Sequence, residues 1–91
     1  MLVALVAHDK TDATQVRADN RPAHLEYLKA NANTVNQAGP LLGASGDMIG
    51  SLIILDVDDM AAAQRWAAED PYAQAGLFET VTLTEWKRVI G

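Results

Sequence analysis

Two short apolar runs constrain this chain more than any other feature of its sequence. Leu2 to Ala7 is continuously apolar, and Ile49 to Val57 is centred on four apolar residues, Leu52 to Leu55. Both runs are rich in strand formers. Because successive side chains of a strand point to opposite faces of the sheet, each run places apolar side chains on both faces. The folded molecule must therefore cover both faces of its sheet.

The segment between the two runs predicts one helical region and one weaker strand. Residues 11–33 have a helical pattern, in which apolar residues recur three and four positions apart on one face, namely Leu25, Leu28, Ala32 and Val35. Because proline disrupts a helix interior, Pro22 predicts a short first helix and a main helix that begins near Asn20. Residues 37–42 predict a second strand, which Pro40 confines to a sheet edge or a strand start. This strand and residues 49–57 form a hairpin through the turn at 43–47.

The last third of the chain predicts a helix and a final strand. Asp58 is a suitable N-cap for a helix over residues 59–69, which packs through Met60, Ala63, Trp66 and Ala67. Since a residue before proline disfavours the helical conformation, the helix ends at Asp70, and a short turn follows. Residues 77–86 alternate as a strand does.

The predicted order βαββαβ is that of a ferredoxin-like α+β fold, an antiparallel sheet with two helices on one face. The 91 residues suffice for one domain, spanning residues 1–91. Two helices cover only one sheet face and leave the other as an apolar patch of the kind that marks an interface. We therefore expect a homodimer, formed through the open sheet face.

The sequence lacks the residues that several classes of function require. The chain has no cysteine and only two histidines, in no ligand spacing, so neither disulfides nor a transition-metal site is expected. Residues 43–46 (GASG) lack the lysine of a phosphate-binding loop. The net charge of −5, without a basic cluster, argues against nucleic acid as a partner.

The hydropathy pattern bears on location. No apolar run approaches the ~20 residues that a membrane-spanning helix needs, so no membrane association is expected. The first residues lack the basic region of a signal peptide, which predicts a cytoplasmic location.

Two titratable residues are candidates for chemistry. His24 lies at the border of the predicted apolar stripe of its helix, a position typical of an inert boundary histidine as well as of one that faces a cleft. Asp70 lies at a helix C-terminus, where the helix dipole disfavours a carboxylate, although Asp-Pro also simply ends helices. His8, at a strand end, is expected to be solvated.

An ordered set of short motifs runs along essentially the whole chain: Arg17, then residues 21–25 (RPAHL), 38–41 (AGPL), 50–51 (GS), Ala63, 70–72 (DPY), 75–77 (AGL) and Glu79. This set resembles the YciI-like (YCII-related) family of small dimeric α+β-barrel proteins. The resemblance implies a ferredoxin-like fold whose sheets pack face to face in a homodimer. It also implies an active site in which His24 pairs with Asp70, and a substrate pocket lined by Ser51, Arg17, Arg21, Gly39, Pro40 and Tyr72.

A few relatives in this family are thought to eliminate chloride from chlorinated hydroxyquinols, and most have no assigned reaction. The resemblance therefore implies a cofactor-independent enzyme, resembling a lyase or an isomerase, that uses a His24–Asp70 general acid/base on a small cyclic or phenolic substrate. Ser51 or Arg21 would hold a developing oxyanion. Two alternatives stay open: a small-molecule-binding or regulatory dimer without turnover, and an interaction domain whose dimer surface is its whole role.

Overall fold

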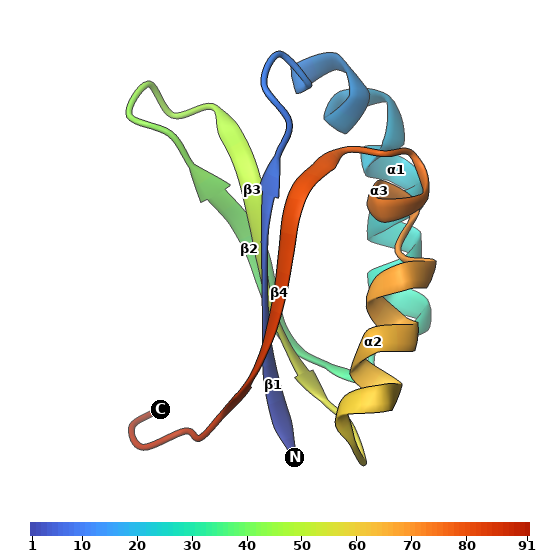
Figure 1. Cartoon of the computed structure of the whole chain (residues 1–91), viewed down its shortest axis with the longest axis vertical. Helices are drawn as coiled ribbons and strands as arrows, with labels where there is room; N and C mark the ends of the chain where they lie inside the picture. Colours follow the sequence, from blue (N-terminus) through green and yellow to red (C-terminus); the bar gives the residue numbers. More distant parts are fainter.

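The computed structural model describes residues 1–91 and has the predicted ferredoxin-like α+β architecture (Figure 1). In chain order its elements are β1 (Leu2–Asp9), α1 (Thr14–Ala30), β2 (Val35–Leu42), β3 (Met48–Asp56), α2 (Met60–Glu69), α3 (Pro71–Gln74) and β4 (Phe78–Trp86). No helix is long and apolar enough to cross a membrane.

The four strands form one antiparallel sheet in the order β2-β3-β1-β4. All three helices lie on one side of this sheet, and the other side is open (Figure 1). Pro40 lies in β2, an edge strand, as its missing backbone donor requires. The predicted hairpin of β2 and β3 is confirmed.

The core lies between the sheet and the helices. On β1 the alternate residues Val3, Leu5 and Ala7 are buried, and they pack with Ala63 and Trp66 of α2. The predicted packing stripe of α2 is therefore confirmed. On the opposite sheet face Leu52 remains 41% exposed and Trp86 36% exposed.

The first helix differs from its prediction. Instead of a short helix followed by a main helix that begins near Asn20, α1 runs as one helix of 17 residues with Pro22 inside it. Two buried residues of α1 hold the helix to the rest of the protein on both sides of the proline: Arg17 bonds to Asp9, and His24 bonds to Asp70. These contacts explain why the helix continues although Pro22 supplies no backbone donor.

The buried face of α1 also differs from the predicted apolar stripe. The two buried residues of the helix are Arg17 and His24, whereas Leu25 is 36% exposed and Ala32 lies beyond the helix. The polar residues are buried because their partners, Asp9 and Asp70, lie opposite them. Leu28 does pack against the core, with partial exposure.

Two details of the second half need correction. The N-cap of α2 is Asp59, not Asp58, and its side chain accepts a hydrogen bond from the backbone N–H of Ala62 at 2.8 Å. The expected turn after Asp70 is a short helix, α3, because Pro71 suits the first position of a helix and the Asp70 side chain caps it.

Candidate active site

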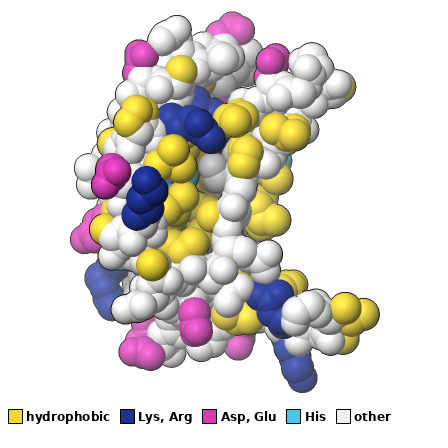
Figure 2. Space-filling model, turned by 180° about the vertical axis from the view of Figure 1, so that it is seen from behind, with side chains coloured by type: hydrophobic (Ala, Val, Ile, Leu, Met, Phe, Trp, Pro, Cys, Tyr) yellow, Lys and Arg dark blue, Asp and Glu magenta, His cyan; other side chains and the backbone are white.

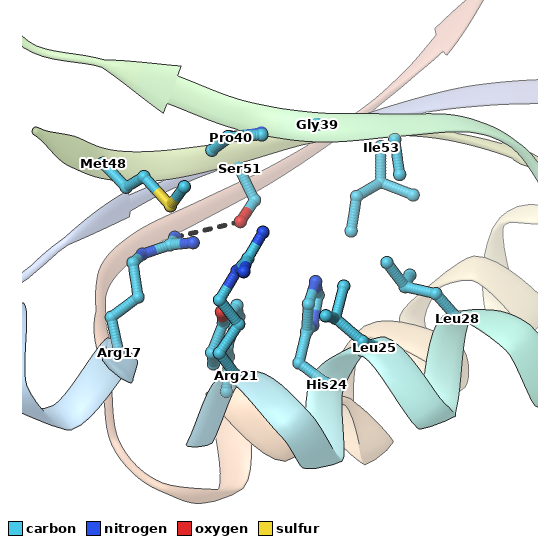
Figure 3. A pocket seen from close by; sticks show the side chains of 12 residues that line it. Arg17, Arg21, His24, Leu25, Leu28, Gly39, Pro40, Met48, Ser51 and Ile53 are labelled. Carbon is cyan, nitrogen blue, oxygen red and sulfur yellow. Dashed lines mark hydrogen bonds between the residues drawn. The ribbon is translucent and has the colours of Figure 1, made fainter. Parts of the chain in front are cut away.

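A pocket of about 170 Å³ lies between α1 and the β2-β3 hairpin (Figure 3). Its lining consists of Arg17, Arg21, His24, Leu25 and Leu28 of α1, Ala38, Gly39 and Pro40 of β2, Met48, Ser51 and Ile53 of β3, and Tyr72 of α3. Every predicted pocket residue is among them, together with His24. Asp70 is not a lining residue; it lies behind His24.

His24 is buried, with 6% of its surface exposed. Its Nδ1 lies 2.8 Å from Oδ1 of Asp70, and its ring stacks on that of Tyr72, with centroids 3.9 Å apart and planes 15° apart. The stacking on Tyr72 holds one face of the imidazole ring, and the hydrogen bond to Asp70 holds its Nδ1 atom. The other nitrogen, Nε2, has no hydrogen-bond partner in the protein and belongs to a residue that lines the pocket.

Asp70 is held in place by its position between two helices. It follows α2 and caps α3, where its Oδ1 accepts the backbone N–H of Tyr72 at 2.9 Å as well as the bond to His24. Its second oxygen, Oδ2, is buried without a partner. An ionised carboxylate only accepts hydrogen bonds, so of the two neutral tautomers of His24 it favours the one that carries its proton on Nδ1, in which Nε2 is the nitrogen that can accept a proton.

Arg17 is fixed by three hydrogen bonds. Its Nε and Nη2 bind the two carboxylate oxygens of Asp9 at 2.7 and 3.0 Å, and Nη2 also donates to Oγ of Ser51 at 3.0 Å (Figure 3). Its guanidinium lies 4.6 Å from the ring centroid of Tyr72. Burial by itself lowers the pKa of Arg17, but the hydrogen bond and charge of Asp9, with a smaller contribution from Tyr72, together outweigh burial and raise that pKa above its ordinary value. Arg17 therefore stays charged.

Tyr72 forms the floor beneath His24 and Arg17. It is 1% exposed, and burial raises the pKa of its hydroxyl, although the charges of Arg17 and Arg21 lower it in part. Its ring therefore remains a neutral aromatic surface on which both side chains rest.

Sequence reasoning did not single out Asp9, which orients Arg17, or the apolar part of the pocket wall. Asp9 is the last residue of β1. It lies eight residues before Arg17 in the sequence, and this spacing is the only local indication that the two side chains pair. Leu25 was predicted to pack in the core, but it lines the pocket instead.

A second, larger hollow of about 470 Å³ lies on the open sheet face, lined by residues of β1, β2, β3 and β4 that include Ala4, Leu52, Ile54 and Trp86. Figure 2 shows hydrophobic side chains gathered on the hollowed side of the molecule, above the projecting C-terminal tail. No residue that lines this second hollow titrates, so the candidate chemistry belongs to the smaller pocket.

Comparisons with solved structures agree with this fold. The 5-chloro-2-hydroxyhydroquinone dehydrochlorinase of Burkholderia phenoliruptrix, solved in complex with 2,5-dihydroxybenzoquinone, superposes with a TM-score of 0.90 at 34% identity; the match covers 96% of this chain and 94% of that chain. An antibiotic biosynthesis monooxygenase superposes with a TM-score of 0.52 at 15% identity over 97% of this chain and 100% of that chain, and it supports the fold alone.

Sequence comparison assigns the family. Protein YciI of Escherichia coli O6:H1 is 37% identical over 98% of this chain and 99% of that protein. An uncharacterized protein of Haemophilus influenzae is 30% identical over 98% of this chain and 99% of its own length. The family model described as the YCII-related domain matches residues 1–87. This chain belongs to the YCII-related domain family.

Proposed function

We propose that this protein is a small-molecule enzyme in which His24 is the general base and acid and Asp70 orients it. The observation that carries the proposal is the buried hydrogen bond of 2.8 Å between Nδ1 of His24 and Oδ1 of Asp70, beside a pocket that His24 lines. Because the carboxylate of Asp70 holds Nδ1, the ring is oriented so that Nε2 can take up and release protons.

Elimination from a small ring is the reaction that suits this arrangement. In the keto tautomer of a chlorinated hydroxyquinol, where chlorine is bonded to a tetrahedral ring carbon, Nε2 of His24 would take the proton of a conjugated hydroxyl group. The O–H electron pair would form a carbonyl group, the adjacent ring double bond would shift to the carbon that bears chlorine, and chloride would leave with its bonding electrons. The overall products are the unsaturated ring, a proton and chloride. Asp70 would balance the positive charge that His24 acquires.

The size of the pocket sets the scale of the substrate. A protein cavity of about 150 Å³ holds one benzene molecule, so the pocket of about 170 Å³ suits a single substituted ring. Leu25, Leu28 and Ile53 offer an apolar wall to such a ring. The 34% identical structural neighbour carries the name of a dehydrochlorinase and was solved with a one-ring quinone, which supports the same substrate class here.

The test is chloride release from chlorinated hydroxyquinols, measured with a chloride electrode and with mass spectrometry of the organic product. We expect turnover by the parent protein and a loss of at least about a hundredfold in His24→Ala, since general acid/base catalysis contributes ~10²–10⁴-fold. Arg65→Gln is the matched control, because Arg65 is exposed on α2 and does not line the pocket; it should keep the parent rate.

The same assay separates catalysis from plain binding. If the parent protein binds these compounds but releases no chloride and forms no new product, the catalytic proposal is wrong and the non-catalytic binding module takes its place. Full activity in His24→Ala would also contradict the proposal. Nitrogen-15 NMR of the His24 ring gives a second check, since loss of the acceptor in Asp70→Ala should shift protonation away from Nδ1.

A further inference from the structure

The charge inside the pocket differs from the charge of the whole chain. The protein carries a net charge of −5, yet the pocket is lined by two arginines and a histidine and by no Asp or Glu. A cleft that presents one sign of charge within low-dielectric walls concentrates ligands of the opposite sign. The pocket is therefore suited to a negatively charged ligand, and the two arginines differ in how they could bind it.

The charge of Arg17 is already paired within the protein. Its partner is the carboxylate of Asp9, whose side chain is 7% exposed and accepts two hydrogen bonds from Arg17, so the charge of Arg17 is compensated within the protein. A buried ion pair of this geometry is costly to separate. Arg17 therefore adds little net charge to the pocket and acts on its neighbour Ser51.

The Arg17 bond determines the direction in which Ser51 can hydrogen-bond. An arginine N–H only donates, so Oγ of Ser51 must be the acceptor in its 3.0 Å bond with Nη2 of Arg17. The hydroxyl proton of Ser51 has no acceptor in the protein, and Ser51 is 2% exposed and lines the pocket. That proton is thus left to donate to a ligand oxygen.

Arg21 is the uncompensated charge. It lies one turn along α1 from Arg17, and it forms no ion pair with any carboxylate. Figure 3 shows its side chain rising from α1 toward Ser51 and the sheet, on the same side of the pocket. The guanidinium of Arg21 and the hydroxyl of Ser51 therefore both offer donors to one region, next to His24.

We propose that Arg21 and Ser51 form a subsite for one anionic oxygen, so that the ligand of this pocket is a monoanion, a one-ring phenolate or enolate. Arg17 and Asp9 are positioning residues that leave the Ser51 hydroxyl free to donate. This inference rests on the proposed function in taking the same pocket as the substrate site, and it adds the charge of the substrate and the residues that select it.

The probe is 4-nitrophenol, whose phenolate form absorbs visible light and whose neutral form does not, with nitrobenzene as the uncharged counterpart. We expect the parent protein to bind the phenolate in preference to nitrobenzene. Arg21→Gln should weaken phenolate binding by about ten- to hundredfold, the range for loss of a charged hydrogen bond, and leave nitrobenzene binding unchanged. Arg21→Lys should recover part of the loss, since the charge returns.

Two further variants complete the test. Ser51→Ala should weaken phenolate binding by severalfold without affecting nitrobenzene, because it removes one neutral donor. Arg65→Gln removes the same charge from an exposed site outside the pocket and should leave both affinities at the parent values. Equal effects of Arg21→Gln on phenolate and nitrobenzene, or no effect on either, would overturn the inference.

This binding measurement requires no turnover, so its result can contradict the proposed subsite without contradicting the proposed reaction, and the reverse. Phenolate selectivity that depends on Arg21, in a protein without chloride release, would leave the subsite intact and reject the reaction. Turnover that depends on His24, in a protein whose Arg21→Gln variant keeps its preference for phenolate, would do the reverse.

Discussion

At the scale of single residues, the protein buries polar side chains in pairs. Arg17 with Asp9 and His24 with Asp70 are each joined at hydrogen-bonding distance, as the cost of burying an unpaired charge demands. Tyr27 belongs to the same pattern, because its hydroxyl donates at 2.8 Å to the backbone oxygen of Trp66 near the end of α2. That bond satisfies one of the carbonyl groups left over at a helix C-terminus.

Tyr27→Phe tests the energetic role of this bond. Burial first, then the charges of Glu69 and Asp70, raise the pKa of Tyr27 from 10.0 to about 12. A raised pKa in the folded state holds the proton that the unfolded chain releases, so its stabilisation is complete below pH 10.0 and is lost as the pH rises to about 12. We expect Tyr27→Phe to lower the free energy of unfolding by about 1 kcal/mol at neutral pH.

Urea unfolding of parent and variant, at neutral pH and across this alkaline window, checks the expectation. The difference between the two proteins should shrink as the pH rises, since the variant has no hydroxyl to titrate. A difference that stays constant across the window would show that Tyr27 does not titrate as its burial implies.

At the scale of the elements, strand patterns were predictable and helix α1 was not. The strands β1 and β3 follow from short continuous apolar runs, and the edge position of β2 follows from the missing backbone donor of Pro40; both are local properties that can be read from the sequence. The continuity of α1 depends on tertiary partners near residues 9 and 70, which no local pattern reveals. Asp9 was missed for the same reason, whereas His24 and Asp70 were found as a pair through the family resemblance.

Pro22→Ala measures how much the proline inside α1 lowers the free energy of unfolding. Proline inside a helix is ~3 kcal/mol less favourable than alanine, so this change should raise the free energy of unfolding by about 1–3 kcal/mol in thermal or urea unfolding. Pro71→Ala is the matched control: Pro71 opens α3, where proline is well suited. That variant should gain nothing, because it only increases the freedom of the unfolded chain. A loss of stability in Pro22→Ala would contradict the expectation.

At the scale of the whole molecule, the sheet has one covered face and one open face. The open face carries a hollow of about 470 Å³, walled in part by Ala4, Leu52 and Ile54, and beside it the C-terminal tail projects from the sheet (Figure 1). In that tail Val89 is 84% exposed and Ile90 is 91% exposed. Apolar surface of this kind is typical of an interface, and we propose that a second copy of the chain covers it.

Sedimentation of a charged variant tests this assembly. We expect the parent protein to sediment as a dimer and Leu52→Glu, which places a charge in the centre of the open face, to sediment as a monomer. Val16→Glu introduces the same charge on the outer surface of α1, where the native residue is 36% exposed, and should remain dimeric. A monomeric parent protein, or two variants that behave alike, would rule out this interface.

The strand order β2-β3-β1-β4 has a consequence for how the protein is made. Of the four strands of this sheet, β1 is synthesised first and is an inner strand, and its two neighbours, β3 and β4, are synthesised later, the second of them from Phe78 to Trp86. At ~5–20 residues per second, β1 waits for some seconds with both edges unpaired and an apolar sequence. Newborn chains of this protein should therefore depend on chaperones during translation more than the small size of the finished domain suggests.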